Sequence, residues 1–135
     1  MKFAEFHTGQ VLRQGPAALS QQQIIDFATA WDPQWFHTDP VAAEHGQHGG
    51  LIASGWQTCA LAMRMAVDAW LAGSESFASP GIEQIRWLQP VRPDMPLYLQ
   101  ADVLEVRRSA KRPELGVVRW RWQLERADDA SLVMD

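Results

Sequence analysis

The stretch W-D-P-Q-W-F-H-T-D-P, residues 31–40, and the stretch H-G-G-L-I-A-S-G-W, residues 48–56, decide how the rest of this chain is interpreted. The first contains an acid, Asp32, and an imidazole, His37. The second is rich in glycine and leads through Gly55 into a long apolar segment. An acid, a base and a helix N-terminus within two dozen residues predict an acid/base site, for which the remaining residues form the scaffold.

The spacing of Asp32 and His37 has two interpretations. Pro33 disfavours helical backbone at Asp32, so the segment cannot be one regular helix, and a loop can turn both side chains toward one point. Such a pair suits general acid/base chemistry, in which one group takes a proton from water and the other supplies one to carbon. In the alternative interpretation Asp32 caps a loop and His37 is an ordinary loop histidine. The spacing alone leaves both open.

The glycine at position 55 also has two interpretations. Ser54-Gly55-Trp56-Gln57 matches a capping box, which predicts a helix that starts here and extends to about Leu71, before Gly73. A helix N-terminus offers unpaired N–H groups and a partial positive charge, and glycine lets a ligand approach them. Gly55 would then stabilise an enolate developing on a thioester or another carbonyl. A glycine needed only for loop-to-helix geometry explains the same residue.

The hydrophobic pattern predicts an α+β fold. A capping box at Ser20 and Gln23 predicts a helix that ends near Asp32, and Asp39-Pro40 predicts a short one that ends before Gly46. The helix at Gly55–Leu71 is apolar on nearly every side, which is typical of a helix wrapped by other elements. We therefore expect an antiparallel sheet of four or five strands curled around it. Strands are expected near residues 11–12 and at 82–91, 97–107 with a bulge near 103, 118–125 and 131–134.

Length and composition limit the possible functions. The 135 residues predict one domain, 1–135, and a 47% hydrophobic share allows a core without disulfides. A formal charge of −4 and a pI of about 5.5 argue against a nucleic-acid partner. The sequence has neither a signal-peptide pattern nor an apolar run long enough for a membrane span, so we expect a cytoplasmic protein without a membrane partner. Seven tryptophans favour an oligomer.

Other kinds of site fit the sequence less well. His37, His45 and His48 match no standard metal-ligand spacing, so no metal is expected. Ser54 is not part of a G-x-S-x-G motif and is better explained as a helix cap. Cys59 lies in an apolar helix, where packing explains it better than nucleophilic catalysis.

Two segments together resemble a known family. Phe27 to Ala43 reads F-A-x3-D-P-Q-x-F-H-x-D-P-x-x-A, and Gly49 to Trp56 reads G-G-L-I-A-S-G-W. Both are similar to the MaoC-like dehydratases, relatives of the (R)-specific enoyl-CoA hydratases. Arg86 to Asp94, R-W-L-Q-P-V-R-P-D, resembles the strand and turn that commonly follow in this family. The resemblance covers most of the chain, from about Ser20 to Gly116.

The resemblance implies a fold, an activity and a site. The fold would be the hot dog, a long helix wrapped by an antiparallel sheet, in a homodimer or a higher oligomer built from dimers. The activity would be syn addition of water to a trans-2-enoyl thioester, or its reverse. Asp32 and His37 fall on the acid and base positions, and Gly55 falls on the glycine whose N–H is the oxyanion donor. No metal or redox cofactor is implied, because coenzyme A arrives with the substrate.

The substrate-binding prediction includes one departure from the family. Gln34-Trp35 replaces the Asn-Pro of the hydratase signature, and Trp35 is bulky where the family has proline. Further candidates for contact with the substrate flank Gly55: they are Ser54 and Trp56. Candidate partners for the phosphates of coenzyme A are Arg64, Arg86 and Arg92.

Two other functions remain open from the sequence. A hot-dog thioesterase would hydrolyse the thioester with a carboxylate on or near the central helix, where Asp68 is the only candidate. A non-catalytic acyl-CoA-binding protein, or one subunit of a mixed assembly, is favoured if Trp35 narrows the pocket.

Overall fold

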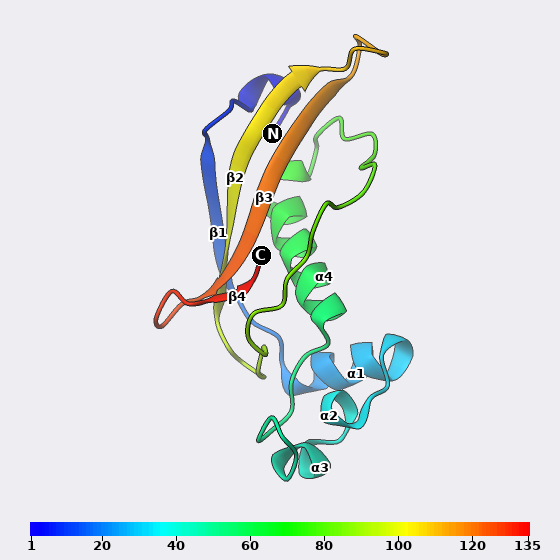
Figure 1. Ribbon diagram of the computed structural model, residues 1–135, viewed down its shortest axis with the longest axis vertical. Coiled ribbons are helices and arrows are strands. Elements are labelled where there is room, and N and C mark those ends of the chain that lie inside the picture. Colours follow the sequence, from blue (N-terminus) through cyan, green and yellow to red (C-terminus); the bar gives the residue numbers. More distant parts are fainter.

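The computed structural model describes residues 1–135 as four strands and a set of helices (Figure 1). One long helix, α4, is continued by a π-helical segment, η2, and runs alongside the sheet. Three short or medium helices precede it and are grouped at its N-terminal end. In chain order the elements are η1 (Phe3–Glu5), β1 (Val11–Ala17), α1 (Gln21–Trp31), α2 (Trp35–Thr38), α3 (Pro40–Glu44), α4 (Gly55–Ala66), η2 (Val67–Leu71), β2 (Leu97–Arg108), β3 (Gly116–Arg126) and β4 (Leu132–Met134).

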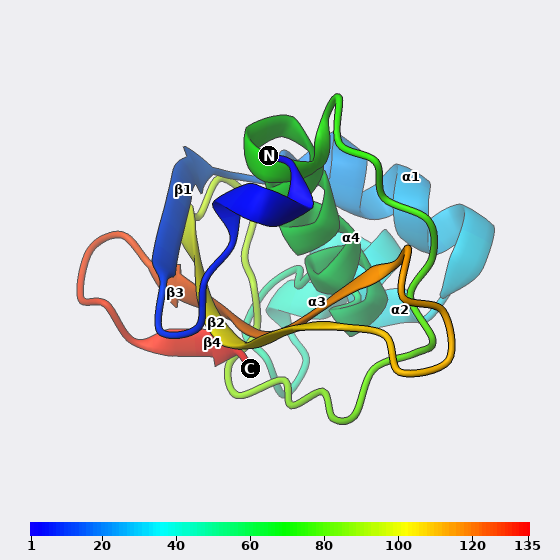
Figure 2. The same cartoon turned by 90° about the horizontal axis from the view of Figure 1, so that it is seen from above.

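The sheet is antiparallel throughout, in the order β1-β2-β3-β4. The long β2–β3 hairpin forms its centre, with Leu99 opposite Leu124. The register shifts between Val103 and Glu105, so the bulge expected near Val103 is confirmed. Figure 2 shows the sheet curving past α4, which lies on one of its faces. This is the α+β arrangement that the sequence predicts.

The core lies between β2 and α4. Alternate side chains of β2, from Leu97 to Val103, are buried, as the two-residue period of a strand requires. The opposite side of α4 is open: Trp56, Met63 and Val67 are 60%, 49% and 37% exposed. The sheet of one chain therefore covers only one side of the helix, although the sequence predicts cover on nearly every side.

Of the two predicted capping boxes, one follows the sequence and the other does so only in part. Ser20 Oγ accepts a hydrogen bond from Gln23 N at 3.1 Å, and Gln23 Oε1 accepts one from Ser20 N at 2.9 Å, which confirms the first capping box. Ser54 Oγ accepts a hydrogen bond from Trp56 N at 3.3 Å and caps α4. Gln57 does not complete a second box, because its Nε2 donates to Gln23 O at 2.9 Å and ties α4 to α1 instead.

Three predictions about extended or loop segments were wrong. The segment 82–91 forms no strand: Trp87 makes one isolated bridge to Met134, because β4 offers only three residues for pairing. The helix α2 was not expected between the two prolines. The strand β1 is longer than expected and continues through Gly15-Pro16 with a shift in register. No helix has both the length and the apolar character that crossing a membrane requires.

The position of the core predicts that two leucines of β2 contribute differently to the free energy of unfolding. Leu99 is 0% exposed on the face toward α4, whereas Leu104 is 45% exposed at the bulge. Leu99→Ala should lower the free energy of unfolding by about 2–5 kcal/mol, because it leaves a cavity in a packed core. Leu104→Ala should lower it by less than about 1 kcal/mol. Urea unfolding of both variants measures the difference, and equal losses would contradict this placement of the core.

Candidate active site

The end of α1 and the short helix α2 bring Asp32 and His37 together. Asp32 ends α1, with its N–H donating to Ala28 O at 2.8 Å, and Pro33 follows outside the helix. The chain then turns at Gln34, whose carbonyl accepts a hydrogen bond from His37 N at 2.9 Å. As a result His37 points back toward Asp32, and the distance from His37 Nε2 to Asp32 Oδ2 is 3.3 Å.

The Asp32 carboxylate accepts hydrogen bonds from two side chains. Gln34 Nε2 donates to Oδ1 at 2.7 Å, and Ser54 Oγ donates to Oδ2 at 2.7 Å. The hydrogen bond from Gln34, then that from Ser54, and the neighbouring His37 lower the pKa of Asp32 below its ordinary value, against the opposing effect of burial. Asp32 is therefore an ionised carboxylate at neutral pH, fixed in one orientation.

His37 is buried, with 5% of its surface exposed, and its ring is oriented by a carbonyl group. Its Nδ1 lies 2.7 Å from Ile52 O. A carbonyl oxygen only accepts, so Nδ1 carries the hydrogen. In the neutral ring the lone pair then lies on Nε2, beside Asp32, where it can take a proton from a bound molecule.

The N-terminus of α4 lies next to this pair. Ser54, the residue that donates to Asp32, also caps α4, so the carboxylate and the helix start are joined by one hydroxyl. The Gly55 N–H has no acceptor in the protein. It lines the same cleft as Asp32 and His37 and can donate to the oxygen of a bound carbonyl group.

The cleft has a volume of about 380 Å³ and contains most of the residues predicted from the sequence. Asp32, Gln34, His37, Ser54, Gly55 and Trp56 all line it. The rest of the lining was not predicted to bind substrate, although His48 was considered as a metal ligand and part of it belongs to the R-W-L-Q-P-V segment: His48, Ile52, Ala53, Thr58, Trp87, Leu88, Gln89, Pro90 and Val91.

Trp35, predicted to contact the acyl substrate, does not line this cleft. Its ring packs over Gly46, where an added Cβ would lie 2.4 Å from Trp35 Cη2. It also contacts the edge of the Phe36 ring, with centroids 5.3 Å apart. The bulk that replaces the proline of the family signature is therefore accommodated on the far side of α2, outside the cleft.

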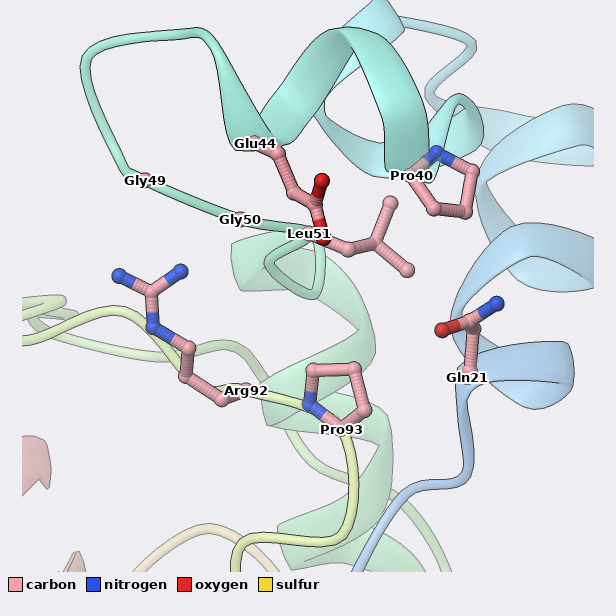
Figure 3. Close-up of a pocket in the computed structure, with 8 residues that line it drawn as sticks. All are labelled: Gln21, Pro40, Glu44, Gly49, Gly50, Leu51, Arg92 and Pro93. Carbon is pink, nitrogen blue, oxygen red and sulfur yellow. The ribbon is translucent and has the colours of Figure 1, made fainter.

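A second hollow, of about 300 Å³, lies between the start of α1, α3 and the turn at Arg92 (Figure 3). In Figure 3 the Arg92 side chain points toward the Gly49–Gly50 segment, and Glu44 points into the hollow from α3. Arg92 Nη2 donates to His48 O, and Nη1 is enclosed without an acceptor. Arg92 thus supports the glycine-rich loop that brings His48 to the first cleft.

The other two candidate phosphate partners lie outside the first cleft as well. Arg64 donates to Asp68 at 2.7 Å along the helix, and Arg86 lies 3.9 Å from Asp135. No group of three side chains with metal-ligating atoms converges anywhere in the structure. His45, one of the three histidines considered as metal ligands, instead follows the last residue of α3 and places Nδ1 2.9 Å from Val41 O.

Comparison with known proteins places this chain in a family. The chain is 34% identical to the uncharacterised protein YdeM of Bacillus subtilis (strain 168) over 87% of its length and 82% of that protein. Its structure is similar to that of a MaoC-like dehydratase from Rhodospirillum rubrum, with a TM-score of 0.84 and 30% identity over 97% of this chain and 88% of that one.

A more distant likeness concerns the fold alone. The unliganded (R)-hydratase PhaJ1 from Pseudomonas aeruginosa superposes with a TM-score of 0.73 at 22% identity, over 98% of this chain and 79% of that one. The shared arrangement is the hot-dog fold. The family model described as "MaoC like domain" matches residues 2–120. The chain therefore belongs to the family of MaoC-like dehydratases and hydratases.

Proposed function

We propose that this protein is an acyl-thioester hydratase/dehydratase that adds water to, or removes it from, the double bond of a trans-2-enoyl-CoA. One observation carries the proposal: Asp32 Oδ2 and His37 Nε2 lie 3.3 Å apart in a cleft that also contains the unpaired N–H of Gly55. An acid/base pair beside a backbone donor matches what hydration of a polarised double bond requires. Membership of a family with (R)-hydratases among its structural neighbours supports it further.

In the hydration direction, water binds within reach of Asp32 and His37 and its oxygen forms a bond to C3 of the substrate. The proton that leaves the water is received by this pair and passed to C2, so the protein ends as it began. The thioester oxygen accepts a hydrogen bond from Gly55 N–H while negative charge develops on it. Every atom added comes from water, so the reaction needs no cofactor beyond the coenzyme A of the substrate.

Ser54 and Gln34 act by holding the carboxylate. Their donation to separate oxygens of Asp32 fixes its plane and keeps it ionised, because both bonds favour the charged form. Trp56, 60% exposed at the cleft, would contact the acyl or pantetheine part of the substrate. A cytoplasmic location stays a prediction of the sequence.

The alternative functions have less support. Asp68, the carboxylate that a thioesterase would use, is exposed, pairs with Arg64 and does not line the cleft. A non-catalytic binding role would be favoured if Trp35 narrowed the pocket. Trp35 packs on Gly46 and does not line the cleft, so it gives no support to a binding role. The hydratase is therefore the function that the geometry supports best.

We further propose a homodimer in which a second copy covers the open side of α4. The exposed residues Trp56, Met63 and Val67 form a stripe along that side, with the helical spacing of one face. Solved structures with a similar fold include two complexes from Mycobacterium tuberculosis, HadBC and ChsH1-ChsH2.

The proposed reaction gives the first activity prediction. Asp32→Asn and His37→Ala should each lower the rate at least about 100-fold, because each removes one half of the acid/base pair. Hydration of crotonyl-CoA and of a longer trans-2-enoyl-CoA, followed by loss of enone absorbance, measures the rate. Free thiol measured in the same reactions detects a thioesterase.

Two matched variants control for the loss of charge and of a histidine. Asp26→Asn and His45→Ala change exposed residues outside the cleft, so both should keep the wild-type rate within about twofold. Full activity of Asp32→Asn, or thiol release without loss of the enone, would refute the hydratase function.

The dimer gives a separate prediction. Met63→Glu introduces a charge at the centre of the stripe and should yield monomers, because an unpaired charge is costly at a buried interface. Val41→Glu, at a 70% exposed position on α3, should leave the dimer intact. Light scattering after size-exclusion chromatography gives the mass of each, and a wild-type monomer would argue against this interface.

A further inference from the structure

Trp87 contacts Gly55 in two ways, and neither contact is part of the proposed acid/base chemistry. Its indole Nε1 donates a hydrogen bond to Gly55 O at 2.9 Å. Its ring lies over the Gly55 backbone, so that a Cβ added there would be 2.5 Å from Trp87 Cε2 and 2.7 Å from Nε1. We propose that Trp87 is a positioning residue that holds the Gly55 N–H in place for the substrate carbonyl, an inference that rests on the proposed function.

The ring explains why position 55 is a glycine. Gly55 does not have a positive φ, and alanine is a good residue in a helix, so the backbone itself would accept a side chain there. The space does not accept one, because the Trp87 ring occupies it. The glycine therefore serves contact with Trp87, in addition to any approach by a ligand.

Trp87 is itself anchored to the sheet. Arg86 and Asp135 exchange two backbone hydrogen bonds, of 2.7 and 3.0 Å, and Leu88 N donates to Val133 O at 2.9 Å. Trp87 lies between these contacts and bridges Met134. Its indole thus connects the edge of the sheet to the first turn of α4.

This connection has a chemical consequence. An oxyanion donor acts over a narrow range of distances, about 2.7–3.1 Å from the developing charge. Helix ends move more readily than helix interiors, and a displacement of about 1 Å in a catalytic group can lower a rate about 100-fold. Ser54 holds α4 from the side of Asp32, and Trp87 holds it at the Gly55 carbonyl. Trp56 packs edge-on against Trp87, with centroids 5.4 Å apart, and completes the contact.

Replacement of the indole by a phenyl ring tests the hydrogen bond. Trp87→Phe keeps an aromatic ring over Gly55 but loses the N–H donor. We expect kcat on crotonyl-CoA to fall about fivefold, the effect of one neutral hydrogen bond, with KM changed by less than about twofold. The matched control is Trp122→Phe, because the Trp122 indole N–H is enclosed and has no acceptor to lose. That variant should keep both constants within about twofold of the wild type.

A pair of variants tests the role of the ring. Gly55→Ala should lower kcat at least about 30-fold, because its Cβ collides with Trp87 and displaces the donor. Adding Trp87→Ala makes room, so the double variant should be at least about fivefold more active than Gly55→Ala alone, a coupling that independent sites do not show. Thermal unfolding of every variant is measured in parallel.

The outcomes separate this inference from the proposed function. An active wild type whose kcat falls in Trp87→Phe but not in Trp122→Phe supports the positioning role, and so does recovery in the double variant. Unchanged kcat in Trp87→Phe, with only a lower unfolding temperature, overturns it while the hydratase function stands. A wild type without hydratase activity overturns the proposed function and the positioning role together.

Discussion

The hydrogen bond from Ser54 to Asp32 is the interaction on which the rest of the site depends. Ser54 lies at the start of α4 and Asp32, 22 residues earlier in the sequence, at the end of α1, so a single hydroxyl joins the two helices. The same carboxylate accepts a hydrogen bond from Gln34 Nε2 and lies 3.3 Å from His37 Nε2. Two donors on separate oxygens, Gln34 Nε2 and Ser54 Oγ, fix the orientation of the carboxylate and keep it ionised.

The edge of the sheet contacts the site through Trp87. The strand β4 and the extended segment beside it carry Trp87 to the N-terminus of α4, where Trp87 lines the same cleft as Asp32. The start of α4 is therefore held from two directions, by the α1–α2 region and by the sheet. A backbone donor held in this way is preorganised, since little motion accompanies the change of charge during reaction.

Prediction from sequence succeeded for features that depend on neighbouring residues in the chain. It failed for features that depend on contacts between residues far apart in the sequence. The cap at Ser20, the bulge near Val103 and the extent of the long helix follow from neighbours in the chain, and the structure has them. Gln57 matched a capping box, yet its side chain has a buried partner in α1, which local sequence does not reveal. The segment 82–91 has the composition of a strand, but its neighbour β4 has only three residues, so the pairing is limited to one isolated bridge.

By itself the sequence determined most element types, the family motif and the candidates for the acid, the base and the helix-start glycine, because residue type, spacing and capping are local properties of the chain. Only the tertiary structure decided that Asp32 and His37 approach within 3.3 Å, that Trp35 packs on Gly46 outside the cleft, and that Trp87 lies against Gly55. Each of these is a contact between side chains whose directions depend on how α2, α4 and the sheet pack together. Such directions are fixed by packing, and packing is a property of the whole fold.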